Sequence, residues 1–179
     1  LVVTAGLVTD RDKIIRSGRA CEGDWLYLVG SEEGSLGASR YQQSVNGEPL
    51  GKTTDPDHES EKSFRDRAIK TAQTQAAHSG RVTAGGGLAV ALASEAIASK
   101  KGVEIDLAPK TTVESLLFSE GGARAIYAVS PEKAKEFEKI WEGFPCRRIG
   151  KVGGDKFVWH SVMELPLKDL VDAFTEGKY

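Results

Sequence analysis

The sequence has little cysteine and no excess of either charge. Its two cysteines, Cys21 and Cys146, match no metal-ligand spacing and are too few for a secreted scaffold held by disulfides. A net charge of -2 provides no basic field for nucleic acid or an anionic membrane. No apolar run reaches the roughly 20 residues of a transmembrane helix, and no signal peptide is recognisable. These absences favour a cytoplasmic protein that binds neither nucleic acid nor membrane.

The length and the first residues bear on domain organisation. With 179 residues, 40% of them hydrophobic, the chain is long enough to form one domain, residues 1–179, with its own core. The opening segment LVVTAGLV, residues 1–8, is typical of a β-strand that begins at the first residue. Such a start favours a piece excised from a longer protein over a mature amino terminus produced by processing.

Hydrophobic periodicity and turn residues predict an irregular succession of strands and helices. Expected strands are 1–8, 24–30, 103–107 and 124–130, and a hairpin is expected from 146–152, the turn 153–155 and 156–162. Expected helices are 40–45, 57–78, 86–99, 111–121, one that opens at 130–132 and one from 166. The helix 86–99 has no polar face, so it should be central. We therefore expect an α+β fold, an α/β sandwich in which one mixed β-sheet carries helices on its faces.

Two polar segments have only partial similarity to ligand sites. NGEPLGKTT, residues 46–54, lacks the first glycine and the preceding strand of a phosphate-binding P-loop, so we interpret it as an exposed loop. DPDHE, residues 55–59, contains possible metal ligands, but a helix start with acids in its first turn explains each residue. The histidines are scattered, and no motif identifies a nucleophile or a general base.

The most informative motif is the run of three glycines, Gly85, Gly86 and Gly87, directly before the apolar helix. A helix amino terminus presents unpaired N–H groups and partial positive charge, and glycines there let a phosphate approach the backbone. Glycines also serve in tight turns with positive φ and close packing. Apart from Arg81 no nearby cation completes an anion site, so the residues alone leave both alternatives open.

Four segments, GGGLAVALASEAIAS, GVEIDL, LLFSEGGARAIYAVSPE and FPCRRIGKVGG, occur in an order that resembles a known family. This is the carboxy-terminal domain of the phosphoribosylformylglycinamidine synthases, the glutamine-dependent ligases of purine biosynthesis. Residues 5–30, LGASRYQQ and PLKDLVDAFTEG resemble the same domain, so the similarity covers nearly the whole chain. Aminoimidazole ribonucleotide (AIR) synthetase and selenophosphate synthetase belong to the same superfamily.

The resemblance implies a reaction, its cofactors and its partners. ATP would phosphorylate the amide oxygen of formylglycinamide ribonucleotide, and ammonia from glutamine would displace the phosphate. ATP and Mg²⁺ would be bound mostly by an amino-terminal half that lies outside this chain, and a glutaminase domain or subunit would make the ammonia. The isolated domain should be inactive, because no acid, base or nucleophile in it can be assigned a step.

The resemblance assigns eight residues in three turns to phosphate or nucleotide binding. They are Gly85, Gly86, Gly87 and Leu88 in the glycine loop, Gly37 and Ser39 in a Leu-Gly-x-Ser turn, and Ser119 and Glu120 in a Phe-Ser-Glu turn. A helix cap explains Ser39 equally well, and a helix end explains Ser119 and Glu120.

Two departures from the family pattern affect the expected site. The family often has His-Asp-Val-Ser-Asp/Glu before its glycines, whereas Arg81, Val82, Thr83, Ala84 and Gly85 stand here. Arg40 stands where an acid is common. The chain is then either a branch with altered recognition or one whose site has become structural. A non-catalytic scaffold domain of the complex, or the matching domain of another AIR synthetase-related enzyme, remains the alternative.

Overall fold

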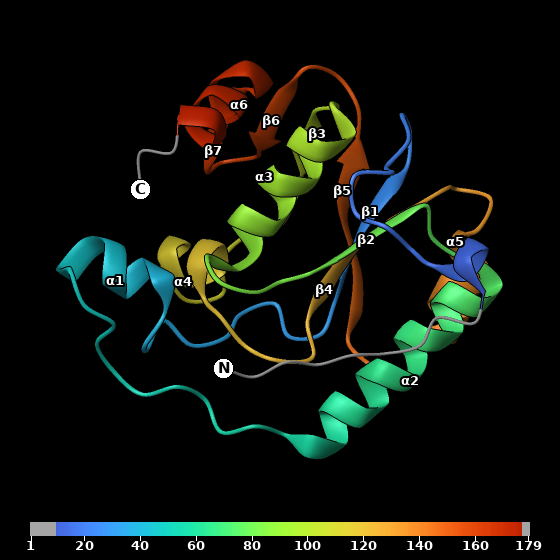
Figure 1. Cartoon of the computed structure of the whole chain (residues 1–179), viewed down its shortest axis with the longest axis horizontal. Helices are drawn as coiled ribbons and strands as arrows, with labels where there is room; N and C mark the ends of the chain where they lie inside the picture. The colour runs from blue at the N-terminus through green and yellow to red at the C-terminus, as the bar shows by residue number, and fades with distance from the viewer. Residues whose placement is uncertain (1–9, 177–179) are drawn as a thin grey trace.

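One mixed β-sheet forms the centre of the computed structural model, which describes residues 10–176 (Figure 1). Its seven strands lie in the order β2-β4-β1-β5-β3-β6-β7, and the pair β3/β6 is parallel while the other pairs are antiparallel. The strands are β1 (Trp25–Val29), β2 (Ser79–Val82), β3 (Val103–Ile105), β4 (Ala125–Val129), β5 (Cys146–Val152), β6 (Lys156–Trp159) and β7 (Met163–Pro166). The expected mixed sheet is confirmed.

Helices cover both faces of this sheet. They are α1 (Arg40–Asn46), α2 (His58–Thr74), α3 (Gly87–Ser99), α4 (Val113–Phe118), α5 (Ala134–Ile140) and α6 (Leu167–Glu176), after a short 3-10 helix η1 (Arg11–Lys13). Figure 1 shows α3 and α6 on one side and α2 and α5 on the other. Because side chains alternate along a strand, Leu26 and Leu28 of β1 join the core beneath α3, and Tyr27 and Val29 join the core beneath α2 and α5. The sandwich expected from the sequence is therefore present.

The central position predicted for the apolar helix is confirmed in α3. Leu88, Leu92 and Ala96 are fully buried, whereas Val90 is 45% exposed. The acid Glu95 is also buried, at 2% exposure, and is a polar exception in this helix. Within residues 10–176 no helix, α3 included, combines the length and the apolar character needed to cross a bilayer.

The hairpin expected around residues 153–155 is wrong, because β3 lies between β5 and β6. β3 is antiparallel to β5 and parallel to β6. The turn packs against the residue before β3, where the Gly102 N–H donates to the Gly154 carbonyl and the Gly153 N–H donates to the Gly102 carbonyl. A Cβ on Gly102 would lie 2.4 Å from the Lys156 carbonyl oxygen, so only glycine allows this approach. The hairpin that does form joins β6 to β7, a strand that the sequence analysis missed.

Several helix and strand bounds also differ from expectation. α2 stops at Thr74 rather than at residue 78, because Gln75 adopts a left-handed conformation with φ 51°. β3 ends at Ile105 and α5 begins at Ala134, so both are shorter than predicted. The strand expected at residues 1–8 lies outside the described residues.

The helix expected from the box Thr111 to Glu114 begins one residue later and ends earlier. Thr112 caps α4 by accepting a hydrogen bond from the Ser115 N–H, and α4 ends at Phe118 rather than before the glycines at 121–122. The Thr111 hydroxyl instead donates to Glu33 Oε2 at 2.6 Å. The cap predicted for α1 is confirmed, since Ser39 Oγ accepts from the Gln42 N–H.

Candidate functional site

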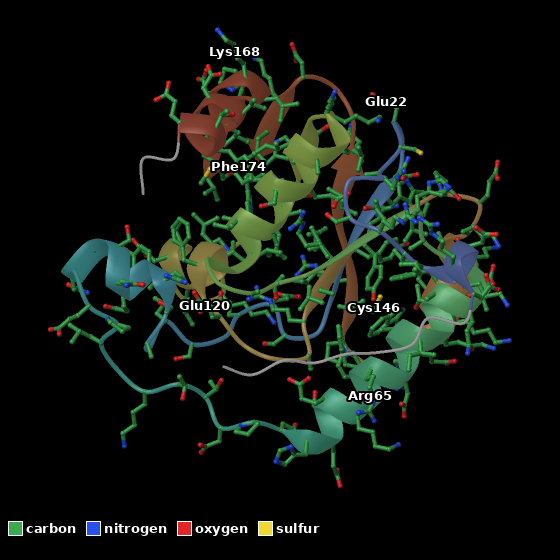
Figure 2. The ribbon with its side chains drawn as sticks, viewed as in Figure 1. Glu22, Arg65, Glu120, Cys146, Lys168 and Phe174 are labelled. Atoms are coloured by element: carbon green, nitrogen blue, oxygen red, sulfur yellow. The ribbon has the colours of Figure 1, made fainter. Side chains whose placement is uncertain are left out.

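The carboxylate of Glu120 connects the three turns that the resemblance assigns to ligand binding. Its Oε1 accepts hydrogen bonds from the N–H groups of Gly86 and Arg40, both at 2.8 Å. Gly86 is the N-cap of α3, and Arg40 is the first residue of α1. Backbone hydrogen bonds between Ser35 and Glu120, at 3.0 and 2.9 Å, hold the turns together. In Figure 2 Glu120 lies beside the ends of α1 and α4. We call Gly85, Gly86, Arg40 and Glu120 the glycine cradle.

Two of the three glycines are required by the backbone of the cradle. Gly86 and Gly87 have φ of 88° and 70°, which strongly favour glycine. A Cβ on Gly87 would lie 2.7 Å from the Phe118 backbone, so α3 and α4 approach here without an intervening side chain. The tight-turn alternative therefore accounts for these two glycines. It does not account for the direction of the Gly86 N–H, which points at an anionic oxygen.

The other predicted site residues have structural partners. Ser39 is 1% exposed, and its hydroxyl donates to the Leu36 carbonyl while capping α1. Ser119 is fully buried, and its Oγ accepts from the Gly34 N–H at 2.8 Å. Leu88 is a core residue, and Gly37 leaves room for the Lys52 carbonyl, which a Cβ would approach to 2.1 Å. These contacts give each residue a role in shaping the cradle, and ligand contacts at these positions stay predictions.

Arg40 places a cation at the glycine loop. A Cβ on Gly85 would lie 3.2 Å from Arg40 Cγ, and the guanidinium donates to Gln43 Oε1 at 3.1 Å. In the sequence alone, Arg40 is only a departure from the family pattern. The cradle thus combines two converging N–H groups with one guanidinium, which is chemistry for binding an anion.

Sequence reasoning missed Arg124, whose guanidinium holds the turn that contains Ser119 and Glu120. This residue is 1% exposed, and its guanidinium donates to the Ser119 carbonyl at 3.0 Å and to the Glu32 carbonyl. Burial lowers the pKa of Arg124 to about 10, so the side chain stays charged at neutral pH. Its position just before β4 was the available signal, because a charged residue seldom enters a fully buried strand without a partner.

The acidic segment 55–59 has the structural role proposed from its sequence. Asp57 caps α2 by accepting from the Glu59 and Ser60 N–H groups, both at 3.1 Å. Among the described residues, the potential metal ligands that gather are Cys21, Asp24 and His78, whose ligand atoms lie within 4.8 Å of one another. Asp24 is already engaged there, since it accepts from the Cys21 N–H at 2.7 Å and lies 3.0 Å from His78 Nδ1.

Comparison with known proteins gives one family and consistent relatives. A family model described as "AIR synthase related protein, C-terminal domain" matches residues 22–160. The chain is 32% identical over 176 residues to "Phosphoribosylformylglycinamidine synthase subunit PurL" of Thermoanaerobacter sp. (strain X514), covering 95% of the chain and 24% of that protein. The protein of the same name from Allorhizobium ampelinum is 34% identical over 175 residues, covering 94% and 23%. The chain therefore spans about a quarter of the length of these relatives.

Solved structures agree with the fold. "T. maritima PurL complexed with FGAR" superposes with a TM-score of 0.72 at 16% identity, covering 89% of this chain and 30% of that one. "Hydrogenase Maturation Protein HypE" superposes with a TM-score of 0.58 at 20% identity, covering 85% and 55%. At these identities the likeness establishes the architecture alone.

Proposed function

Because the chain belongs to the family of AIR synthase related protein C-terminal domains, we propose that it is the carboxy-terminal domain of a phosphoribosylformylglycinamidine synthase. The identity of 32–34% to two proteins of that name, over nearly the whole chain, supports this assignment. The complete ligase would convert formylglycinamide ribonucleotide, ATP and glutamine to formylglycinamidine ribonucleotide, ADP, phosphate and glutamate. An amino-terminal half and a glutaminase domain or subunit would be its partners, and residues 1–179 would act as one domain of the cytoplasmic complex.

The role proposed for this domain is to bind a phosphoryl group at the glycine cradle. The observation that carries it is the convergence of the Gly86 and Arg40 N–H groups on one anionic oxygen. An incoming phosphate of the nucleotide or the ribonucleotide would compete with the Glu120 carboxylate for these donors. Arg40 would add a charge-assisted contact, which is stronger than a neutral one.

The cradle fits a phosphate better than a metal ion. ATP, when bound, supplies the phosphoryl group that activates the substrate amide, and Mg²⁺ would accompany it. Mg²⁺ prefers several oxygen ligands in octahedral geometry, and Glu120 alone supplies a carboxylate to this cradle among the described residues. We therefore assign the ligands of Mg²⁺ to the amino-terminal half and the phosphate contact to this chain.

A second candidate is a scaffold domain of the same complex that binds no substrate. The observation that favours it is that Glu120 already satisfies both N–H donors of the cradle. The fold is also shared with a hydrogenase maturation protein, so the matching domain of another AIR synthetase-related enzyme is the third candidate.

Titration calorimetry of the chain with ADP and with formylglycinamide ribonucleotide separates these candidates. If phosphate and Glu120 compete for the same donors, Glu120→Gln will strengthen binding several-fold, because the neutral amide is the weaker competitor. Glu114→Gln is the matched control, since Glu114 is an exposed acid in the first turn of α4. No heat from either ligand with the wild type and with Glu120→Gln would favour the scaffold.

A further inference from the structure

A basic hollow lies beside the start of β2, the edge strand of the sheet, and shares no lining residue with the glycine cradle. Its volume is about 290 Å³, and its lining is Arg11, Asp12, Ile14, Arg16, Arg19 and His78. Four of these six side chains are arginine or histidine, although the chain as a whole carries a net charge of -2. Within residues 10–176 none of the three arginines forms an ion pair with an acid. Three arginines thus line one small hollow, in which Asp12 is the acid of the lining.

The backbone that carries two of these arginines is fixed by a buried carboxylate. Glu95 of α3 accepts hydrogen bonds from Ser17 Oγ at 2.8 Å and from the Gly18 N–H at 3.0 Å. Gly18 has a φ of 77°, and a Cβ there would lie 2.8 Å from the Ala98 side chain, so the turn packs directly on α3. The residues between Arg16 and Arg19 are therefore held in one conformation.

Ser79, the first residue of β2, fixes the two ends of the same turn. Its fully buried Oγ lies 2.9 Å from the Arg16 carbonyl oxygen and accepts from the Arg19 N–H at 3.2 Å. It also contacts the Glu95 carboxylate. Arg16 and Arg19, both exposed, thus lie at the two ends of a turn that buried side chains hold in place.

His78 is oriented toward this hollow by another buried acid. Both oxygens of Asp24, which is 2% exposed, lie 3.0 Å from His78 Nδ1. The imidazole is 44% exposed, and it lines the hollow next to the arginines. Asp24 is itself held by the Cys21 N–H at 2.7 Å. The ring is therefore positioned in advance of binding, which reduces the entropy lost on binding.

From this arrangement we infer a second anion site, at which Arg11, Arg16, Arg19 and His78 bind a small phosphoryl anion such as phosphate or diphosphate. Guanidinium groups present planar pairs of donors that match the oxygens of a phosphoryl group. The volume lies at the lower limit of roughly 300–1,000 Å³ for small-molecule sites, so it suits the phosphoryl group rather than a whole nucleotide. The same three arginines disfavour a metal cation on the adjacent Cys21, Asp24 and His78.

The test is a titration of the full chain with inorganic phosphate and with diphosphate at physiological salt, followed by calorimetry and by ³¹P line broadening. We expect saturable binding, and we expect Arg16→Gln and Arg19→Gln each to weaken it by about tenfold or more, because each removes a charge-assisted contact. His78→Gln should weaken it to a smaller extent. Thermal unfolding of each variant verifies that it is folded.

Two variants that remove a positive charge outside the lining serve as controls. Lys13→Gln acts in the same segment, where Lys13 pairs with Asp10 at 3.3 Å, and Arg65→Gln acts on α2 (Figure 2). Both should leave the affinity unchanged. Equal weakening by Lys13→Gln would show that phosphate responds only to the overall positive charge of this segment, and it would overturn the proposed site. The absence of saturable binding would overturn it as well.

Further titrations identify the source of the phosphoryl group and distinguish binding at this site from binding at the glycine cradle. If the group belongs to a larger molecule, ADP or ribose 5-phosphate will bind more tightly than phosphate and phosphate will displace it. If free phosphate is the ligand, the larger molecules will gain no affinity. Glu120→Gln should leave binding at this site unchanged, so its result does not depend on the function proposed for the cradle.

Discussion

Removal of the Glu95 carboxylate should cost more stability than any other single acid-to-alanine change in the described chain. Glu95 is 2% exposed and accepts hydrogen bonds from Ser17 Oγ, the Gly18 N–H and Ser79 Oγ. Hydrogen bonds to a charged group contribute about 1.5–3 kcal/mol each, and a buried donor left without a partner costs about 1–3 kcal/mol. These contributions are not additive, and alanine also removes a charge that is costly to bury. We therefore expect Glu95→Ala to lower the free energy of unfolding by about 3–5 kcal/mol.

Urea unfolding followed by tryptophan fluorescence measures this change directly. Glu95→Gln should lose about half as much, because its amide oxygen still accepts while its NH₂ group faces a donor. Glu114→Ala, an exposed acid, should stay within about 0.5 kcal/mol of the wild type. A loss below about 1 kcal/mol for Glu95→Ala would refute the conclusion that Glu95 fixes the turn between Arg16 and Arg19. Glu95→Gln, if folded, should also weaken phosphate binding at that turn.

Three further results are expected. Gly87→Ala should lower the free energy of unfolding by about 2–4 kcal/mol in the same urea assay, because φ is 70° and the new Cβ would meet the backbone at the end of α4. Burial raises the pKa of the Cys146 thiol to about 12, so a disulfide reagent at mildly alkaline pH should modify the exposed Cys21 quickly and the half-buried Cys146 much more slowly; two fast thiols would contradict this. Burial acts to raise the pKa of Glu33, but its hydrogen bonds, above all the one from Thr111, lower this pKa overall. The Glu33 carboxylate therefore stabilises the fold at pH values above its unfolded pKa, and this stabilisation is lost as the pH falls below 4.5. Melting temperatures from neutral to acidic pH should therefore decline less for Glu33→Gln, and an equal decline would contradict that assignment.

Local patterns predicted most elements of this fold, because caps and periodicity depend on neighbours along the chain. Ser39 was identified as a cap, and its Oγ accepts the expected Gln42 N–H. The apolar run of α3 placed it at the centre, and the short runs that became β1 and β4 were recognised as strands. The hairpin around residues 153–155 was wrong because its turn residues carry no information about a strand from the middle of the chain.

The sites depended on contacts that no local pattern contains. Glu120 was included in the candidate set through the resemblance, but its donors, Gly86 and Arg40, are 34 and 80 residues away in the chain. The arginines of the second site lie between the strands expected at 1–8 and 24–30, where no helix or strand is predicted. Their significance depends on Glu95, whose position in an apolar helix was the one local sign that a buried acid needed partners.

The position of β3 between β5 and β6 has a consequence for how the chain folds. β5 and β6, which flank the turn at 153–155, do not pair with each other. Each must instead pair with β3, which lies much earlier in the sequence. β1 likewise pairs only with β4 and β5, late in the chain. Such pairing raises the contact order, which slows folding and leaves strand edges open to other chains in the meantime. Refolding yield should accordingly fall as protein concentration rises, while the refolding rate stays constant.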